Sequence, residues 1–337
     1  MLQYKGKAVG ILSGGLDSAI AAKLVIDQGF QVTGIFFDTG FLTKETDNNG
    51  KSREQFQLLA DQLEFQSIVV DVFEEYRKVL FAPKYGYGKN MNPCIDCKSF
   101  FLKKALQYAK KINADFIFSG EVLNQRPMSQ NARTLNIIEN EAGVKGLLVR
   151  PLSATYFQPT QVEVSGKLDR SKLLSIKGRD RKIQLKLADM WNLNEFTAPA
   201  GGCLLTDPRF SDRLREWKNQ KDFTKKHLNL LKSGRHFKLP DGSKLVVGRD
   251  EKDNNSLEKI YSGNEWLVGL ADDNVPGATG LYFPVENNFF NEVAQIIGRY
   301  SDYKNGEVCT IIFKKGNNIK KIDVNVDKNS KFSKMLI

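Results

Sequence analysis

Strand-like and helix-like segments alternate over the first two hundred residues, and this alternation limits the fold more than any other feature. Short apolar stretches at residues 7–12, 31–37, 66–72 and 114–120 have the composition of buried strands. Segments with helical spacing lie between or beside them, at residues 17–28, 51–64, 73–81 and 95–112. Continuous apolar strands separated by helices are typical of a parallel sheet covered on both faces. The pattern therefore predicts an α/β fold with a doubly wound parallel sheet, whose ligands bind at the carboxyl ends of the strands.

The pattern changes near residue 220. A helical segment at 223–232 precedes a hairpin signal that turns at Asp241-Gly242, and a second hairpin signal turns at Gly316-Asn317. Helical segments at 250–261 and 288–299 lie between them. We therefore expect two domains, a doubly wound domain at residues 1–215 and a smaller α+β domain at residues 220–337.

Composition adds a broad constraint on partners. The chain of 337 residues has a formal net charge of +11, which favours a polyanionic partner such as RNA but also serves solubility. It contains no run of about 18 apolar residues, and its N-terminus leads directly into the first expected strand. We expect a cytoplasmic protein that does not associate with membranes.

The sequence SGGLDS, residues 13–18, joins the first strand to the first helix. Gly14 and Gly15 allow a sharp turn that presents backbone N–H groups without a Cβ, and the helix N-terminus adds partial positive charge. The hydroxyls of Ser13 and Ser18 can donate further hydrogen bonds, and Asp17 can help to hold Mg²⁺. The segment lacks the Gly-Lys-Ser/Thr ending of a Walker A loop. It predicts a phosphate-binding loop, the alternative being a glycine-rich turn that binds nothing.

Three of the four cysteines call for explanation, since Cys309 lies in an alternating apolar run typical of a buried strand. Cys94 and Cys97 are one helical turn apart, and Cys203 follows Gly201-Gly202. A helix N-terminus lowers the pKa of a thiol, so we expect thiolate character at the first pair. A closed zinc site needs four ligands, one more than these three cysteines supply. Thiol–disulfide chemistry, an iron–sulfur cluster held by three thiolates, and three buried thiols without a special role remain open.

The SGGLDS motif resembles the PP-loop of the ATP pyrophosphatase superfamily, whose fold is the adenine nucleotide alpha hydrolase type. The resemblance covers roughly residues 5–205 and is carried by Ser13, Gly14, Gly15, Asp17 and Ser18. It implies that ATP is cleaved between its α- and β-phosphates. It also implies that the strand end at Phe37 contacts adenine and that Ser119 and Gly120 line the same site.

The blocks NPCIDCK, ADFIFSGE, VRPLS and GGCLLTDP together resemble the tRNA thiouridine synthetases. By this resemblance Cys97 and Cys203 match the two sulfur-handling cysteines, and Cys94 stands where 2-thiouridylases usually keep an aspartate. Relatives with three such cysteines bind a [4Fe-4S] cluster, which implies Cys94, Cys97 and Cys203 as its ligands. The implied cofactors are ATP, Mg²⁺ and the cluster, and the implied catalytic residues are Cys97, Cys203 and Asp17. Without a cluster, Cys97 would carry a persulfide that Cys203 resolves.

Three segments are candidates for RNA contact, and the first is the basic run at residues 175–186, although a charge run is usually only a solvated face. In the resembling enzymes the region of residues 121–139 borders the target base, which implicates Arg126 and Arg133. The block at residues 233–254 resembles NFACT-R-type RNA-binding domains, where Arg235 would contact phosphate and His236 or Phe237 would stack. An oligomerisation or stabilising role for this domain is the alternative.

The expected function is ATP-dependent tRNA uridine thiolation, with 4-thiouridine as the favoured product because of the appended domain. The expected partners are tRNA and a sulfide or persulfide donor, and a homodimer is compatible with the sequence. The alternatives are a tRNA 2-thiouridylase using cluster or persulfide chemistry, a PP-loop ligase that does not thiolate, and a non-catalytic RNA-binding protein.

Overall fold

The computed structural model describes residues 3–42, 51–196, 203–217, 223–285, 289–329 and 332–337. The chain divides into two compact units, Met1–Asp207 and Pro208–Ile337. No helix in the described part of the chain is long and apolar enough to cross a membrane.

Unit 1 is built on a five-stranded parallel sheet with the order β3-β2-β1-β4-β5. Its strands are β1 (Gly6–Ile11), β2 (Phe30–Asp38), β3 (Gln66–Asp71), β4 (Phe116–Ser119) and β5 (Leu148–Val149). The chain adds β2 and β3 on one side of β1 and then crosses to add β4 and β5 on the other side. This reversal places the switch point of the sheet, where such folds bind ligands, between β1 and β4.

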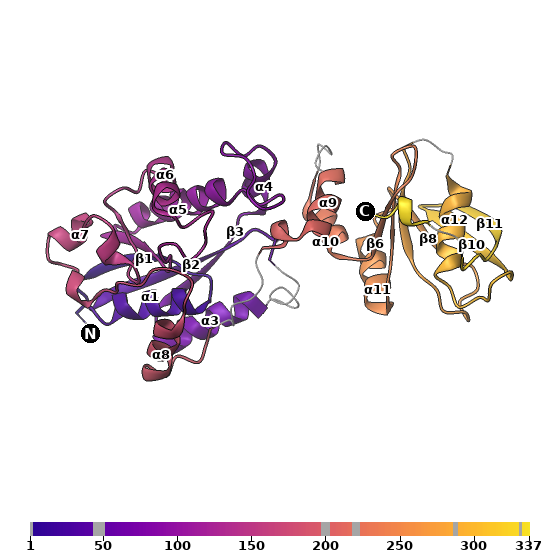
Figure 1. Ribbon diagram of the computed structural model, residues 1–337. Helices are drawn as coiled ribbons and strands as arrows, with labels where there is room; N and C mark the ends of the chain where they lie inside the picture. Colours follow the sequence, from indigo (N-terminus) through magenta and orange to yellow (C-terminus); the bar gives the residue numbers. More distant parts are fainter. Residues whose placement is uncertain (1–2, 43–50, 197–202, 218–222, 286–288, 330–331) are drawn as a thin grey trace. The chain divides into compact units, whose positions relative to one another are not determined.

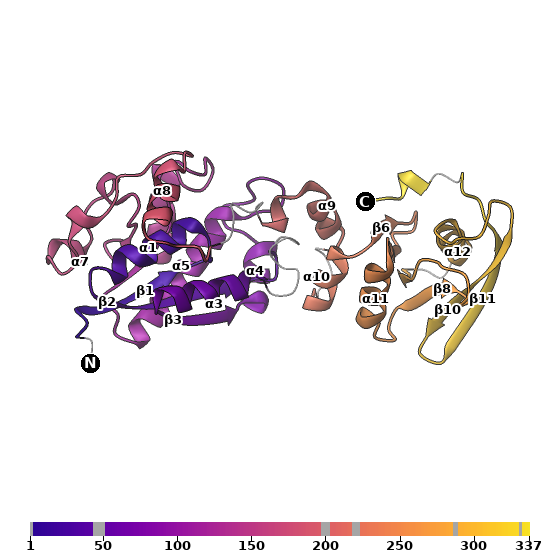
Figure 2. The same cartoon turned by 90° about the horizontal axis from the view of Figure 1, so that it is seen from below.

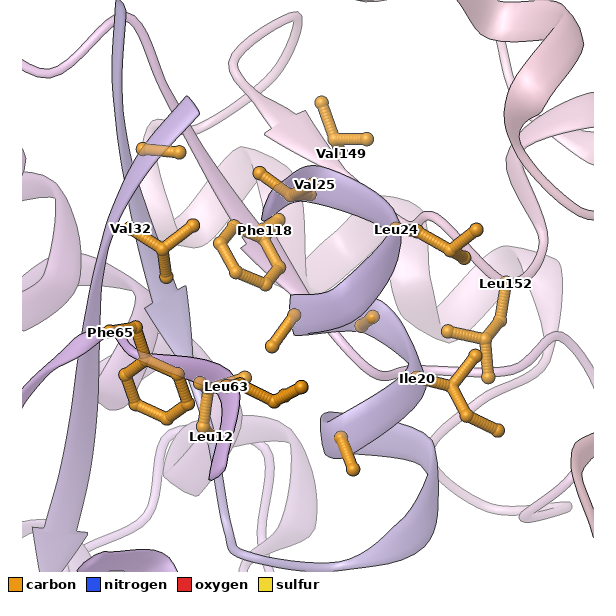
Figure 3. Close-up of a cluster of buried hydrophobic side chains, with 14 of the residues drawn as sticks. Leu12, Ile20, Leu24, Val25, Val32, Leu63, Phe65, Phe118, Val149 and Leu152 are labelled. Carbon is orange, nitrogen blue, oxygen red and sulfur yellow. The ribbon is translucent and has the colours of Figure 1, made fainter. Parts of the chain in front are cut away.

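Helices cover both faces of this sheet (Figure 1). One face packs against α1 (Leu16–Ile26), α3 (Lys51–Leu63) and α8 (Lys182–Met190), and the other against α5 (Cys94–Lys111) and α6 (Ala132–Ala142). Consecutive strand residues point to opposite faces, so Ala8 joins the first core and Val9 the second. Figure 3 shows the first core, in which Val25 of α1 lies near Val32 and Phe118 of the sheet. The short helices α4 (Phe73–Phe81) and α7 (Gln161–Val164) complete the unit.

These elements confirm the expected doubly wound fold. Each of the four expected strands and four expected helices of this region is present within a few residues of its expected limits. The two-residue strand β5 and helix α6 were not expected, because β5 is too short to leave a pattern and α6 carries its few apolar residues among polar ones.

Unit 2 contains a six-stranded antiparallel sheet with the order β11-β10-β8-β9-β7-β6. Its strands are β6 (Arg235–Lys238), β7 (Lys244–Val247), β8 (Trp266–Leu270), β9 (Gly280–Phe283), β10 (Val308–Lys315) and β11 (Asn318–Asn325). Its helices are α9 (Pro208–Trp217), α10 (Lys225–Lys232), α11 (Glu251–Ile260) and α12 (Phe290–Arg299). Both expected hairpins are present, as the pairs β6–β7 and β10–β11. The expected smaller α+β domain is therefore confirmed in its fold.

The division between the units lies one helix earlier than the boundary expected at residues 215–220. The reason is the packing of Trp217 at the end of α9. Its ring lies 5.2 Å from that of His227 and 5.1 Å from that of Phe283. These contacts join α9 to unit 2, which composition alone did not indicate.

Candidate active site

A cavity of about 450 Å³ lies at the carboxyl ends of β1, β2 and β4. This is the edge of the sheet where the switch point predicts a ligand. Its lining brings together most of the expected site residues, namely Ser13, Gly15, Asp17, Ser18, Phe37, Cys94, Cys97, Ser119, Gly120, Arg126 and Cys203. Gly14 turns the chain beside the cavity, with a φ of 72° that favours glycine.

Hydrogen bonds between its first and last residues hold the PP-loop in a tight turn. The backbone N–H of Ser13 donates to Oγ of Ser18 at 3.1 Å, and the two hydroxyl oxygens are also 3.1 Å apart. Gly15 is the N-cap of α1 and has an extended conformation, and the helix begins at Leu16. The loop therefore presents the N-terminus of an 11-residue helix at the cavity, where an anion such as a phosphate is stabilised.

Two glutamine amides hold the carboxylate of Asp17. Gln125 donates from Nε2 to Oδ2 at 2.9 Å, and Gln184 donates from Nε2 to Oδ1 at 3.3 Å. Gln184 lies on α8 and is fully buried, so its amide position is set by packing. Gln184 lies 167 residues from Asp17, and no local pattern in the sequence connects the two residues.

Gly120 allows β4 and the PP-loop to approach closely. A Cβ at residue 120 would lie 2.7 Å from the carbonyl carbon and oxygen of Asp17 and 2.7 Å from the backbone nitrogen of Ser18. Because these are backbone atoms, no side chain can rotate away to relieve the contact. Only glycine is compatible with this arrangement.

The first two cysteines lie where the sequence predicts, at the start of α5. Cys94 is the first residue of the helix, and the backbone N–H of Cys97 donates to the carbonyl of Pro93 at 2.8 Å. Both side chains line the cavity. The helix thus presents two thiols, one turn apart, to the same space as the PP-loop.

Backbone hydrogen bonds hold Cys203 beside this helix. The thiol of Cys203 donates to the carbonyl of Phe41 at 3.4 Å. The N–H of Met91, in the loop before α5, donates to the carbonyl of Leu205 at 3.1 Å. The third thiol therefore reaches the cavity although it lies more than a hundred residues further along the chain. Gly201-Gly202, expected to form the turn before it, lie outside the described residues.

The expected thiolate character of the free cysteines is wrong. Burial raises the pKa of Cys97 to about 12, although a hydrogen bond from Tyr76 opposes the rise. Burial also raises the pKa of Cys203 to about 11 and raises the pKa of Cys94. Loss of hydration outweighs the partial charge of the helix N-terminus, so all three thiols are protonated at neutral pH in the absence of a ligand.

A buried charge network lies directly beside the thiols. The ammonium group of Lys98 pairs with Glu121, and Nε of Arg150 lies 3.0 Å from Oε2 of the same carboxylate. Arg150 is 3% exposed, pairs also with Glu139, and places its guanidinium 4.7 Å from the ring centre of Phe157. Burial alone would raise the pKa of Glu121, but Lys98 and Arg150 lower it to about 2. The network holds a lysine ammonium at the cavity wall, between the thiols and β4.

The end of the cavity beside β2 is aromatic. Phe37, at the end of β2, stacks on Phe101 of α5 with ring centres 5.2 Å apart and planes 1° apart. Both rings line the cavity, as does Arg181 at the N-terminus of α8. Arg181 belongs to the basic segment at 175–186, whose pattern in the sequence did not distinguish a cavity residue from a solvated one.

The expected RNA residues lie on three different segments. Arg126 lines the cavity, whereas Arg133 is exposed on α6 and Arg235 lies on β6 in unit 2. His236 and Phe237 are each 1% exposed, so the expected stacking of RNA on these rings is wrong. His236 contacts the carbonyl of Ser233 at 2.9 Å, and burial lowers its pKa to about 3. Both faces of the sheet are covered at β6, which is why adjacent residues are both buried.

Among the residues that the structure describes, no three His, Cys, Asp or Glu side chains are arranged to hold a single metal ion. In a [4Fe-4S] cluster each thiolate binds a different iron, so the thiols need a wider spacing than around one ion. Cys94, Cys97 and Cys203 share one cavity, and the ionisation of Cys97 responds to the other two. Three separated soft ligands around a common space suit a cluster.

Two family models match the chain. Residues 3–156 match the model of thiamine biosynthesis protein (ThiI), and residues 234–334 match the model of the NFACT protein RNA binding domain. The first match contains the PP-loop and both cysteines of α5, and the second contains the sheet of unit 2.

Curated relatives match over a shorter part of the chain. The tRNA-specific 2-thiouridylase MnmA of Treponema denticola is 38% identical over 109 residues, which are 28% of this chain and 29% of the relative. MnmA of Nitrosomonas europaea is 36% identical over 123 residues, or 34% of each chain. The chain thus spans about a third of the length of the curated relatives it matches.

Solved structures show more distant likeness. A 4-thiouridine synthetase–RNA complex with bound ATP is 17% identical, with a TM-score of 0.37 over 55% of this chain and 50% of that one. The U34-tRNA thiolase NcsA from Methanococcus maripaludis with its [4Fe-4S] cluster is 18% identical, with a TM-score of 0.36 over 68% and 71%. Likeness at this level places no ligand in this chain. The family models agree with both resemblances: residues 3–156 are similar to the ThiI family, and residues 234–334 are similar to the NFACT protein RNA binding domain.

Proposed function

We propose that this protein is an ATP-dependent tRNA sulfurtransferase that converts a uridine into a thiouridine, with 4-thiouridine as the favoured product. One observation carries the proposal: the PP-loop and three thiols line the same cavity. A nucleotide loop alone would serve any ligase of this fold, and three thiols alone would serve many redox roles. Their combination suits a reaction in which ATP activates a carbonyl and sulfur replaces its oxygen.

ATP activation occurs at the PP-loop end of the cavity. Ser13, Gly14, Gly15 and Ser18 hold the phosphates, Asp17 holds Mg²⁺, and the adenine lies at Phe37 between β2 and the segment at Ser119-Gly120. A uracil carbonyl oxygen attacks the α-phosphorus as the adjacent N3 loses its proton. The bond from the α-phosphorus to the bridging oxygen breaks, and pyrophosphate leaves.

Sulfur transfer follows at the thiol end. Hydrosulfide adds to the activated carbon, AMP leaves with the former carbonyl oxygen, and the remaining proton moves from sulfur to N3. Cys94, Cys97 and Cys203 would hold a [4Fe-4S] cluster, which when bound supplies an open iron that can carry sulfide. If no cluster binds, a persulfide donor transfers its outer sulfur to Cys97 and is left as a thiol, and the Cys97 persulfide attacks the activated carbon as AMP leaves. The Cys203 thiol then attacks the Cys97 sulfur, which releases thiouridine and leaves a Cys97–Cys203 disulfide that a thiol reductant reopens.

Residues of both units contact the tRNA. Arg126 at the cavity and Arg133 on α6 contact the tRNA near the target base, and Arg235 contacts it from unit 2. The match of residues 234–334 to an RNA-binding domain supports this assignment. The reaction takes place in the cytoplasm, with a sulfide or persulfide donor, and a homodimer is the proposed assembly.

Nucleoside analysis tests the proposal. Bulk tRNA from a deletion strain should lack one thiouridine, and a plasmid carrying the wild-type chain should restore it. Retention time and ultraviolet absorbance distinguish 4-thiouridine from 2-thiouridine, which has the same mass, so the same digest identifies the product. Unchanged thiouridines in the deletion strain would exclude the proposed function, and loss of 2-thiouridine would correct the position of the sulfur.

A further inference from the structure

Part of the unit 2 sheet has a face that no described helix covers. Helix α12 packs on the inner face, where Val268 and Phe313 belong to the core. On the outer face, α10 and α11 lie beside β6, β7 and β9, where Val246 is 1% and Leu281 0% exposed. Beyond these strands the outer face of β8, β10 and β11 has no helix upon it within the described residues, as Figure 2 shows.

The strand register defines which side chains lie on this outer face. Leu267 pairs with Lys314, which pairs with Ile319, and Gly269 pairs with Ile312, which pairs with Lys321. Ile319 is 63% exposed. A Cβ added at Gly269 would meet no atom within 4 Å, so the centre of the face is open. The outer face is therefore accessible and carries two lysines among aliphatic side chains, with the hydrogen-bonded pair Thr310 and Asp323 at the end away from the hairpin turn.

The lysines of the β10–β11 hairpin are not neutralised within the protein. None of Lys314, Lys315, Lys320 and Lys321 forms an ion pair in the part of the chain that the structure describes. Elsewhere in unit 2, Lys226 pairs with Glu265 at 2.9 Å and Lys238 with Glu216 at 2.9 Å. The hairpin's one carboxylate, Asp323, accepts a hydrogen bond from Thr310 at 2.6 Å.

Protection of a sheet edge does not account for this arrangement. Lysines on an edge strand commonly prevent pairing with a second chain, and β11 is such an edge. Lys314, however, lies on β10, which is paired on both sides. A cation at an interior strand has no edge to protect, so its exposure points to an external anion.

We propose that the outer face of β8, β10 and β11 binds the phosphate backbone of double-helical RNA, with Lys314 and Lys321 as the phosphate contacts. This inference rests on the proposed function, which makes tRNA the RNA that is bound. Single-stranded RNA needs aromatic platforms on which bases stack. The aromatic side chains of these strands, Trp266 and Phe313, instead pack against Phe290 in the core. A face of lysines and aliphatic groups suits the backbone of a duplex, which is recognised by its phosphates and shape.

Salt-dependent binding of bulk tRNA to the full chain, measured without ATP by fluorescence anisotropy, tests the inference. The affinity falls as salt rises, so the plot of log affinity against log salt has a negative slope, and each lost phosphate contact reduces the steepness of this slope by about 1. Lys314→Ala combined with Lys321→Ala should therefore reduce the steepness by about 2. Lys315→Ala combined with Lys320→Ala is the matched control, because it removes the same charge from the inner side of the same hairpin. The control should leave the slope within experimental error of wild type.

Gly269 gives a second, independent readout. Gly269→Lys and Gly269→Glu place opposite charges in an open position at little steric cost. The lysine variant should increase the steepness of the slope by about 1 and the glutamate variant should weaken binding several-fold, with both chains folded. Polyuridine, which is single-stranded, should compete poorly with tRNA for binding to both the lysine variant and wild type.

The outcomes separate this inference from the proposed function. If wild-type chain binds no tRNA, the proposed function fails. If wild type binds but the outer-face variants match wild type, or if both double variants lose slope equally, only the outer-face site is overturned. Equal competition by polyuridine would likewise overturn the duplex assignment. A dimer that Gly269→Glu dissociates, with no change in tRNA binding, would assign the face to a second copy of this chain.

Discussion

Gly120→Ala offers the sharpest test of how the PP-loop is positioned. The new Cβ would lie 2.7 Å from three backbone atoms of Asp17 and Ser18, whereas ordinary contacts begin at 3.4 Å. The loop or the end of β4 must then move by about 0.7 Å, the difference between these distances. Gly120 does not have a positive φ, so alanine adds no backbone strain and the effect comes from this contact alone. Overpacking of this kind costs about 1–3 kcal/mol of unfolding free energy.

The displacement should impair AMP formation from ATP more than it lowers the free energy of unfolding. Because a misplacement of about 1 Å can reduce a rate on the order of 100-fold, we expect at least about a tenfold loss in kcat/KM for AMP formation. Urea unfolding and an AMP assay on the same preparation separate the two effects. Gly269→Ala is the control, since its Cβ meets nothing within 4 Å and it lies in unit 2. Wild-type AMP formation by Gly120→Ala would refute the close approach of β4 to the loop.

Three further predictions concern buried charges. Arg150→Met should destabilise unit 1 by about 3–5 kcal/mol in urea unfolding, because it leaves Glu139 without this partner and Glu121 with Lys98 alone. Lys84→Met, at the exposed pair with Glu141, should cost far less, and equal costs would contradict the burial of the network. The lowered pKa of Glu121 stabilises the fold above its ordinary 4.5, and this stability is lost as the pH falls toward about 2, so Glu121→Gln should show a flatter pH dependence in that window. The pKa of His236 is lowered to about 3 from an ordinary 6.5, so unit 2 should lose stability as the pH falls from 6.5 toward 3. His236→Gln should lose less stability over the same range, as followed by tryptophan fluorescence, and an unchanged pH dependence would contradict protonation of the ring as the cause.

The sequence was sufficient for the parts of the fold that depend on local pattern. The apolar strands and the glycine pair at residues 14 and 15 have signals within a few residues, and the structure shows the expected turn from β1 into α1. The shared cavity of Cys94, Cys97 and Cys203 was expected only because family resemblance connects blocks that are distant in the chain.

Long-range packing explains what the sequence analysis missed. Gln184 reaches Asp17, and Arg181 reaches the cavity, because α8 packs against α1, and no local pattern encodes that contact. The thiol pKa values were misjudged because the helix N-terminus is visible in the sequence and the burial of Cys97 is not. His236 and Phe237 were misjudged for a related reason, since the layers on both faces of β6 come from segments elsewhere in unit 2.

One measurement tests the central claim, that ATP activation and sulfur transfer share one cavity, most directly. Anaerobically purified chain, analysed for iron and sulfide, would be given ATP, sulfide and unmodified tRNA, with pyrophosphate and thiouridine quantified in the same reaction. The account predicts that wild type forms both, and that Cys94→Ala, Cys97→Ala and Cys203→Ala release pyrophosphate in a tRNA-dependent burst but form no thiouridine. Thiouridine formation at the wild-type rate by Cys97→Ala or Cys203→Ala would contradict the account.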